Sequence, residues 1–99
     1  MVTTARAAEL HEGVRRLRIR VTALTTPQLD DGRRTHIRTA LRRLSDVGAH
    51  GRPVPDLGDR VLADQVVVLL TDCLPEYGAT DQQTVRALRI AQDLRQDLA

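Results

Sequence analysis

Residues 7–24, AAELHEGVRRLRIRVTAL, decide the fold of this 99-residue chain. Apolar residues recur in this stretch at intervals of 3, 4, 3, 4 and 3 positions, at Ala7, Leu10, Val14, Leu17, Val21 and Leu24. Because an α-helix has 3.6 residues per turn, these side chains form one narrow stripe, whereas a half-buried strand would need strict alternation. The pattern predicts a helix over about residues 4–24. We expect it to end before Pro27, which disfavours helical geometry at Thr26.

A second helix is expected over about residues 27–47. Thr26 is a suitable N-cap, and Pro27 suits the first helical position because the N–H that proline lacks would be unpaired there. Gly32 weakens the start of this helix. The apolar face is defined by Leu29, Ile37, Ala40, Leu41, Leu44 and Val47.

The clearest loop is residues 48–58, GAHGRPVPDLG, with three glycines and two prolines. A third helix is predicted over about residues 59–74, ended by Pro75. The run VVVLL at residues 66–70 is also compatible with a buried strand, since periodicity alone does not separate the two. The greater length of the apolar pattern favours a helix.

A fourth helix is predicted over about residues 81–98. Thr80 and Gln83 fit a capping box, in which each side chain accepts a hydrogen bond from the other residue's backbone N–H. Four helices joined by two short links and one long link predict a single all-α domain covering residues 1–99. The expected architecture is an antiparallel four-helix bundle, made of two helical hairpins joined by the Gly/Pro-rich loop.

Composition supports packed helices over a β-sandwich. The apolar residues are mainly Leu, Val and Ala, and Tyr77 is the only aromatic residue. The chain lacks Lys, Asn, Phe and Trp, while Arg, Ala, Asp and Leu are abundant, as expected of a GC-rich bacterial genome. Arginine then stands where other proteins use lysine, so its abundance is less informative than usual.

The sequence indicates a cytoplasmic protein. Its first residues lack the apolar segment of a signal peptide. The longest apolar run, residues 66–70, is far too short to span a bilayer.

No catalytic or cofactor motif is recognisable. Cys73 lies in the apolar face of the third predicted helix, which favours a small buried hydrophobic side chain over a nucleophile. His11, His36 and His50 lack ligand-type partners at helical spacing, except for Glu12 beside His11, so no metal site is expected. We expect neither enzymatic activity nor a cofactor, metal or small-molecule ligand.

Charge is distributed unevenly along the chain. Residues 1–52 contain eleven arginines and five acidic residues, and residues 53–99 contain four arginines and eight acidic residues. The halves therefore carry net charges of +6 and −4. The simplest interpretation is that the acidic half packs beside the basic half and balances its charge.

Some arginines of the basic half have no local acidic neighbour. Arg18, Arg20 and Arg38 have none three or four positions away, and Arg34, Arg38 and Arg42 form a ladder on the polar side of the second predicted helix. Arginines that remain unpaired could contact phosphates in a salt-dependent and largely sequence-independent manner. The alternative function is therefore a nucleic-acid-binding accessory or regulatory protein.

Three aliphatic residues lie away from the predicted core faces. Ile19 is opposite the stripe of the first helix, and Val61 and Val68 lie off the main face of the third, among polar residues. Exposed aliphatic residues on successive turns indicate a second contact surface. The leading hypothesis is a small protein-interaction module or adaptor that acts through helix faces, with a two-fold homodimer through Ile19 or Val68 as its simplest form. The partner is expected to be a second copy or another protein.

Overall fold

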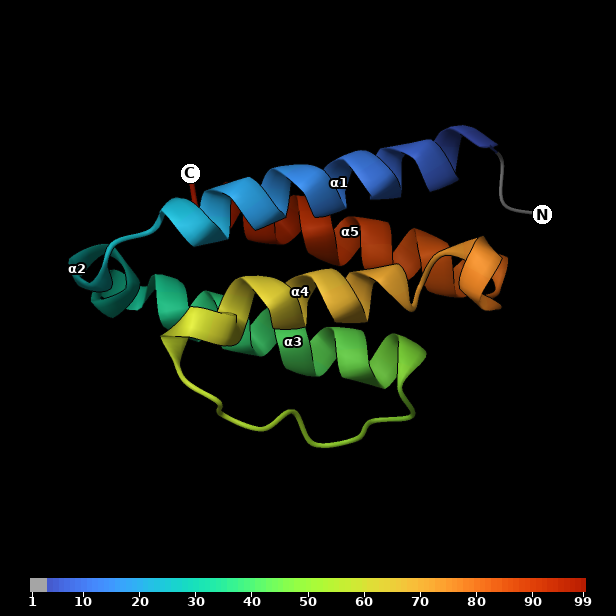
Figure 1. The fold of residues 1–99 in the computed structure, drawn as a ribbon. Coiled ribbons are helices and arrows are strands. Elements are labelled where there is room, and N and C mark those ends of the chain that lie inside the picture. Colours follow the sequence, from blue (N-terminus) through green and yellow to red (C-terminus); the bar gives the residue numbers. More distant parts are fainter. Residues whose placement is uncertain (1–3) are drawn as a thin grey trace.

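The computed structural model describes residues 4–99, which form a bundle of four main helices (Figure 1). These helices are α1 (Thr4–Ala23), α3 (Arg34–Gly48), α4 (Leu62–Thr71) and α5 (Asp81–Asp97). Shorter segments lie between them: α2 (Thr26–Gln28), the wide turn η1 (Leu29–Arg33), and the 3-10 turns η2 (Asp59–Val61) and η3 (Pro75–Tyr77). The described residues include no strand, so the VVVLL run is helical and the predicted all-α class is confirmed.

Each main helix packs against two others. α1 and α3 both contact α4 and α5, so α1 lies diagonally across the bundle from α3 (Figure 1). An ion pair and a hydrogen bond at one end of the bundle show which helix termini lie together there (Figure 1). Arg34 at the start of α3 is 2.7 Å from Asp59 at the start of η2, and Arg20 near the end of α1 donates to the carbonyl oxygen of Leu98 just after α5.

The helix directions correct the expected bundle of two hairpins. α3 runs parallel to α4 and α1 runs parallel to α5, whereas the pairs α1/α4 and α3/α5 are antiparallel (Figure 1). The physical reason is the long connection over residues 49–58. This segment carries the chain back along the outside of the bundle, so that α4 starts at the same end as α3 (Figure 1). We refer to residues 49–58 as the crossover.

The second predicted helix is divided and starts one residue earlier than expected. Thr25, not Thr26, is the N-cap: its Oγ1 accepts a hydrogen bond from the N–H of Gln28, whose side chain accepts one from the N–H of Thr25. Gly32 then adopts φ = 91°, a left-handed conformation that glycine tolerates and that ends the first helical segment. The continuous helix begins only at Arg34.

The third predicted helix is shorter than expected, and the fourth is close to prediction. Residues 59–61 form a 3-10 turn, and α4 ends at Thr71 rather than residue 74. Before α5, the capping box predicted for Thr80 and Gln83 is present. The Gln83 amide also donates to the carbonyl oxygen of Val47 at 3.0 Å, which joins the start of α5 to the end of α3.

The core is formed by the apolar stripes of all four main helices. The stripe of α1 is buried at Leu10, Leu17 and Val21, each at most 6% exposed. Thr84 is fully buried and donates to the carbonyl oxygen of Cys73 at 2.7 Å. Of the helices in residues 4–99, none combines the length and the apolarity that crossing a membrane would require.

Candidate protein-interaction surface

The crossover is held against the bundle by three side chains. The buried hydroxyl of Ser45 donates to the carbonyl oxygen of Arg52 at 2.5 Å. The side-chain amide of Gln65 donates to the carbonyl oxygen of Pro55 at 3.0 Å. Arg38 pairs with Asp56 at 2.5 Å. These contacts join the crossover to both α3 and α4.

The local sequence explains the path of the crossover. At the end of α3 the chain reverses, and the N–H groups of Ala49 and Gly51 both donate to the carbonyl oxygen of Ser45. Gly51 and Gly58 have φ values of 70° and 91°, which favour glycine. The prolines between these glycines lack N–H groups, so this extended segment leaves fewer backbone donors unpaired.

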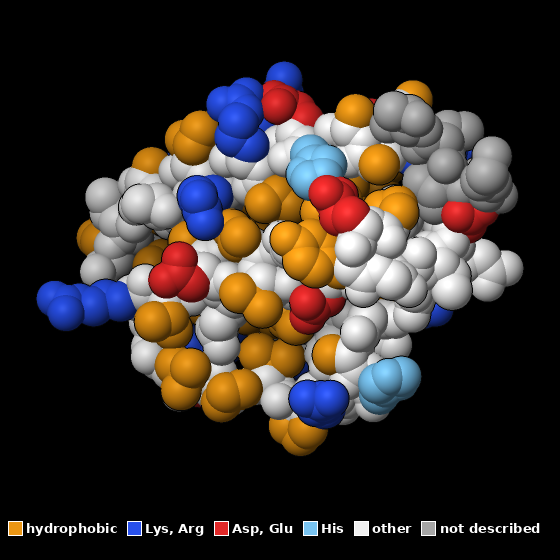
Figure 2. Space-filling model, turned by 45° about the vertical axis from the view of Figure 1, so that its right-hand side comes forward, with side chains coloured by type: hydrophobic (Ala, Val, Ile, Leu, Met, Phe, Trp, Pro, Cys, Tyr) orange, Lys and Arg blue, Asp and Glu red, His pale blue; other side chains and the backbone are white. Residues whose placement is uncertain are grey.

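One side of the crossover forms an apolar groove with α4. The groove has a volume of about 430 Å3, and its aliphatic lining includes Val54, Leu57, Val61, Val68 and Leu69. Leu57 and Val68 are 62% and 56% exposed, whereas the other three are half-buried. Figure 2 shows hydrophobic side chains gathered along the lower part of the molecule, where the crossover runs beside α4.

Charged residues border the apolar groove. Asp64 and Asp72 lie on α4 and directly after it, and Arg52 lies in the crossover. All three are exposed, and within residues 4–99 none of them makes a side-chain hydrogen bond or an ion pair. The surface therefore combines an aliphatic centre with a rim of unpaired charges.

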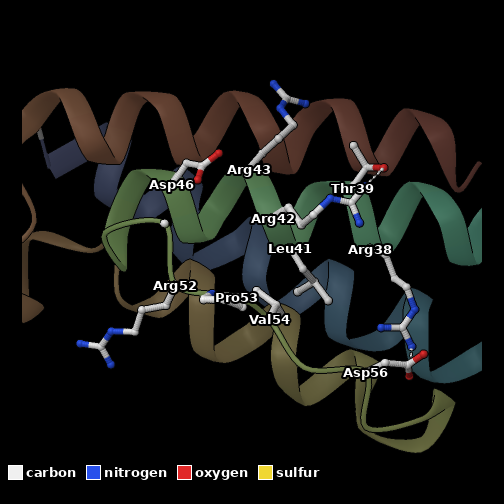
Figure 3. A pocket seen from close by; sticks show the side chains of 11 residues that line it. Arg38, Thr39, Leu41, Arg42, Arg43, Asp46, Arg52, Pro53, Val54 and Asp56 are labelled. Atoms are coloured by element: carbon white, nitrogen blue, oxygen red, sulfur yellow. Dashed lines mark hydrogen bonds and ion pairs between the residues drawn. The ribbon is translucent and has the colours of Figure 1, made fainter.

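The other side of the crossover forms an arginine groove with α3, of about 600 Å3. Its arginines do not converge (Figure 3). Arg38 turns toward Asp56, Arg43 points toward α5, and Arg52 projects away from the groove. The guanidinium of Arg42 donates to the hydroxyl of Thr39 at 3.2 Å. An anion site needs several donors aimed at one point, and this groove does not provide that arrangement.

The structure brings two of the three predicted aliphatic residues together. Val61 and Val68 both line the apolar groove, although Val61 is half-buried rather than exposed. Ile19 is 58% exposed on α1 and lines neither groove. Leu57 belongs to the same surface but was missed in the sequence, because a single leucine in a loop carries no periodic pattern.

Most of the predicted basic contact residues have partners within the chain. Arg34 bridges Asp30 and Asp59 at 2.6 and 2.7 Å, and its hydrogen bonds to Asp59 hold the pKa of the Asp59 carboxyl below its usual range. As described above, Arg20, Arg38 and Arg42 donate to a carbonyl oxygen, a carboxylate and a hydroxyl. Arg18 is exposed and makes no such contact within residues 4–99.

Several ion pairs join the basic half to the acidic half. Arg34 and Arg38 contact Asp59 and Asp56, and Arg43 lies 3.7 Å from Asp93. Within α1, two arginines share one carboxylate: hydrogen bonds from Arg15 and Arg16 lower the pKa of Glu12 to about 2. Many arginines of the basic half therefore form ion pairs with carboxylates of the same molecule.

The residues considered for metal binding or catalysis are dispersed. His11 contacts Glu76 at 2.8 Å and His36 lies 3.4 Å from Asp97, at different places in the bundle. In the described part of the chain, no group of three or more His, Cys, Asp or Glu side chains could hold a metal ion. Cys73 is buried, and burial together with the charge of Asp72 raises the pKa of its thiol to about 11.

Comparison of the chain with protein families, with curated proteins and with solved structures gives no match. The interpretation of the apolar groove therefore rests on its own geometry and chemistry.

Proposed function

We propose that this protein is a small interaction module that binds another polypeptide through the apolar groove between the crossover and α4. The observation that carries the proposal is the exposure of Leu57 and Val68 on one continuous surface with Val61. Single exposed aliphatic residues are common on protein surfaces. Their combination into a groove is a feature of contact surfaces.

Two further properties support a polypeptide ligand. The crossover is fixed to the bundle through Ser45, Arg38 and Gln65, so that little order has to be gained when a ligand binds. Aliphatic side chains at the centre and charged side chains at the rim also match the usual anatomy of a protein interface. The groove thus combines a preformed shape with an appropriate surface composition.

Nucleic-acid binding through Arg18, Arg20, Arg34, Arg38 and Arg42 is the weaker proposal. Phosphate binding requires guanidinium groups that are free to leave their present partners, and Arg34 and Arg38 form ion pairs. Residues 4–99 also expose only one aromatic side chain, Tyr77, for stacking on bases.

Site-specific photocrosslinking tests the proposal. A photoreactive amino acid at position 57 probes the apolar groove, and the same group at position 85 is a matched control, because Val85 is exposed on α5, outside the groove. We expect the photoreactive group at position 57 to form a covalent adduct with the bound polypeptide. This adduct should disappear when Val68→Arg is added to the same variant. Equal adducts from both positions, or adducts that persist with Val68→Arg, would contradict the proposal.

A further inference from the structure

We infer that the ligand of the apolar groove is an amphipathic helix that carries basic residues along the flank of its apolar face that meets α4. This inference rests on the proposed function and adds the chemistry of the partner. It is based on the shape of the groove, on the hydrogen bonds that the crossover already makes, and on two aspartates that line the groove.

The groove follows the axis of α4. The crossover returns along the outside of the bundle beside α4 and forms the second wall (Figure 1). Val61, Asp64, Val68 and Asp72 line the groove at intervals of three or four residues, so they share one face of α4 and of the turn before it. From Val61 to Asp72 this face extends for about 16 Å at the helical rise per residue. A ligand helix of about three turns, lying along α4, would cover it.

The backbone of the crossover is poorly suited to pair with an extended ligand. Pro53 and Pro55 have no N–H to donate, and the N–H groups of Arg52 and Gly58 donate within the crossover. The carbonyl oxygens of Arg52 and Pro55 already accept hydrogen bonds from side chains of α3 and α4. An added strand is held mainly by backbone hydrogen bonds, whereas a helix satisfies its own backbone and is bound through its side chains. The groove therefore favours a helical ligand.

The α4 wall of the groove is acidic. Asp64 and Asp72 lie one turn before and one turn after Val68, and the N–H of Asp72 donates to the carbonyl oxygen of Val68, so the helical spacing holds at this residue. Both aspartates are exposed, and neither forms an ion pair with any residue from 4 to 99. Two basic side chains that lie seven or eight residues apart on a ligand helix would match their separation of about 12 Å.

The position of Asp72 is unfavourable for the fold itself. Asp72 is the C-cap of α4, and the end of a helix carries a partial negative charge that repels a carboxylate. Asp64 differs, because an acidic residue in the first turn of a helix is stabilising. A basic ligand would account for an exposed carboxylate at the rim of the groove that lacks an ion pair within residues 4–99 and disfavours its own helix.

The crossover wall carries the opposite charge. Of the described residues that line the groove, Arg52 is the only cation. It belongs to the crossover, and its side chain projects away from the arginine groove (Figure 3). Basic residues on this flank of the ligand would be repelled. We therefore expect a one-sided pattern, basic toward α4 and neutral or acidic toward the crossover.

Selection from a displayed library of helical peptides tests the inference. The library fixes aliphatic residues on one face and varies the flanking positions among Lys, Glu and Gln. With the wild-type protein as bait, we expect enrichment of Lys on one flank, at positions seven or eight residues apart. Asp64→Asn and Asp72→Asn should each weaken this preference. Asp46→Asn is the matched control, because Asp46 is exposed and makes no ion pair within residues 4–99 but lies outside the apolar groove.

The affinity of a selected Lys-containing peptide then separates binding from folding. Fluorescence anisotropy should show that Asp72→Asn raises the Kd about threefold at low salt and by less at high salt, as expected of exposed ion pairs. The same substitution should leave the stability of the protein unchanged or raise it, because it removes a charge that the end of α4 disfavours. Val68→Arg should abolish binding, since it places a cation in the aliphatic centre of the groove.

Several outcomes would overturn the inference. Enrichment of Glu on the flank toward α4, or no preference between Lys and Glu, would reject a basic ligand. Selected peptides that keep full affinity when a central residue is replaced by proline would not be bound as helices. If no peptide is enriched over the Val68→Arg bait, a basic amphipathic helix is not the ligand. In each of these cases, adducts from position 57 that are lost with Val68→Arg would show that the proposed function stands without the inference.

Discussion

The arginine groove and the apolar groove lie on the two sides of the crossover and are both lined by aliphatic and charged residues. The two sets of residues differ in exposure and in ion pairing. On the α3 side, Arg38 and Arg43 lie near carboxylates of the same molecule, and the arginine groove offers no set of converging donors. On the α4 side, Leu57 and Val68 are exposed, and the rim charges make no ion pair with any residue from 4 to 99. The comparison shows that charge density is a poor guide to a binding surface. What distinguishes the apolar groove is that its groups are left without partners.

The largest expected effect separates a buried lining residue from an exposed one. Leu41 lies beneath the arginine groove and is 1% exposed, so Leu41→Ala should lower the free energy of unfolding by about 2–5 kcal/mol through lost packing and a cavity. Leu57→Ala, in the apolar groove, should change it by less than about 0.5 kcal/mol. Urea unfolding of both variants makes the measurement. Equal losses would mean that Leu57 supports the fold of the monomer.

The next effect concerns Ser45, which holds the crossover between the two grooves against α3. Ser45→Ala removes the hydroxyl that donates to the carbonyl oxygen of Arg52 and should cost about 1 kcal/mol. Amide exchange at Gly51 and Arg52 should accelerate as the crossover loosens. Thr39→Ala is the control, because it removes an exposed contact with Arg42 and leaves the crossover anchored. Unchanged exchange in Ser45→Ala would show that the crossover is held by its other contacts.

A smaller effect compares a paired arginine with an unpaired one. Arg38→Ala should lower the free energy of unfolding by up to about 1 kcal/mol, because the ion pair with Asp56 is partly exposed, and added salt should reduce the loss. Arg52→Ala should leave monomer stability unchanged. Both are measured by urea unfolding at low and high salt. A loss of stability in Arg52→Ala as large as that in Arg38→Ala would contradict this difference between the two arginines.

The smallest effect is a dependence on acid pH. Hydrogen bonds from Arg34 lower the pKa of Asp59 in the folded state, so the folded protein keeps this carboxylate ionised at a pH where the unfolded chain protonates it. The resulting stabilisation is fully present above the unfolded pKa and is lost as the pH falls through the folded pKa. Asp59→Asn should therefore flatten the acid limb of a plot of unfolding free energy against pH. Asp64→Asn, at an unpaired carboxylate, is the control, and an equally steep limb in Asp59→Asn would refute the role of Arg34.

The sequence predicts the helices better than their arrangement. Apolar periodicity locates α1, α4 and α5, and Thr80 with Gln83 correctly marks the start of α5. The N-cap Thr25 was predictable, since Gln28 follows it by three residues as Gln83 follows Thr80. Thr26 was predicted instead because it directly precedes Pro27, which suits the first helical position. Helix direction was not predictable, because a ten-residue link can either turn back at once or run the length of the bundle.

The apolar groove was only partly predictable for a related reason. Val61 and Val68 stand out by helical position, since they lie away from the core face of α4. Leu57 and the backbone near Pro55 join them only because the crossover returns along α4, which no local pattern encodes. The ion pairs of Arg34 with Asp59 and of Arg38 with Asp56 were likewise not predictable. Unlike pairs within one helix, ion pairs between distant segments have no characteristic spacing in the sequence.

The diagonal placement of α1 and α3 affects the order in which the protein folds. Two consecutive helices that packed together could form a stable unit early, from contacts between neighbours in the chain. Here the apolar stripe of α1 is covered by α4 and α5, which are synthesised after α1 and α3. A nascent chain that ends at Gly48 would therefore expose two unmatched apolar stripes. Such a topology favours slower, more concerted folding than an up-and-down bundle of equal size.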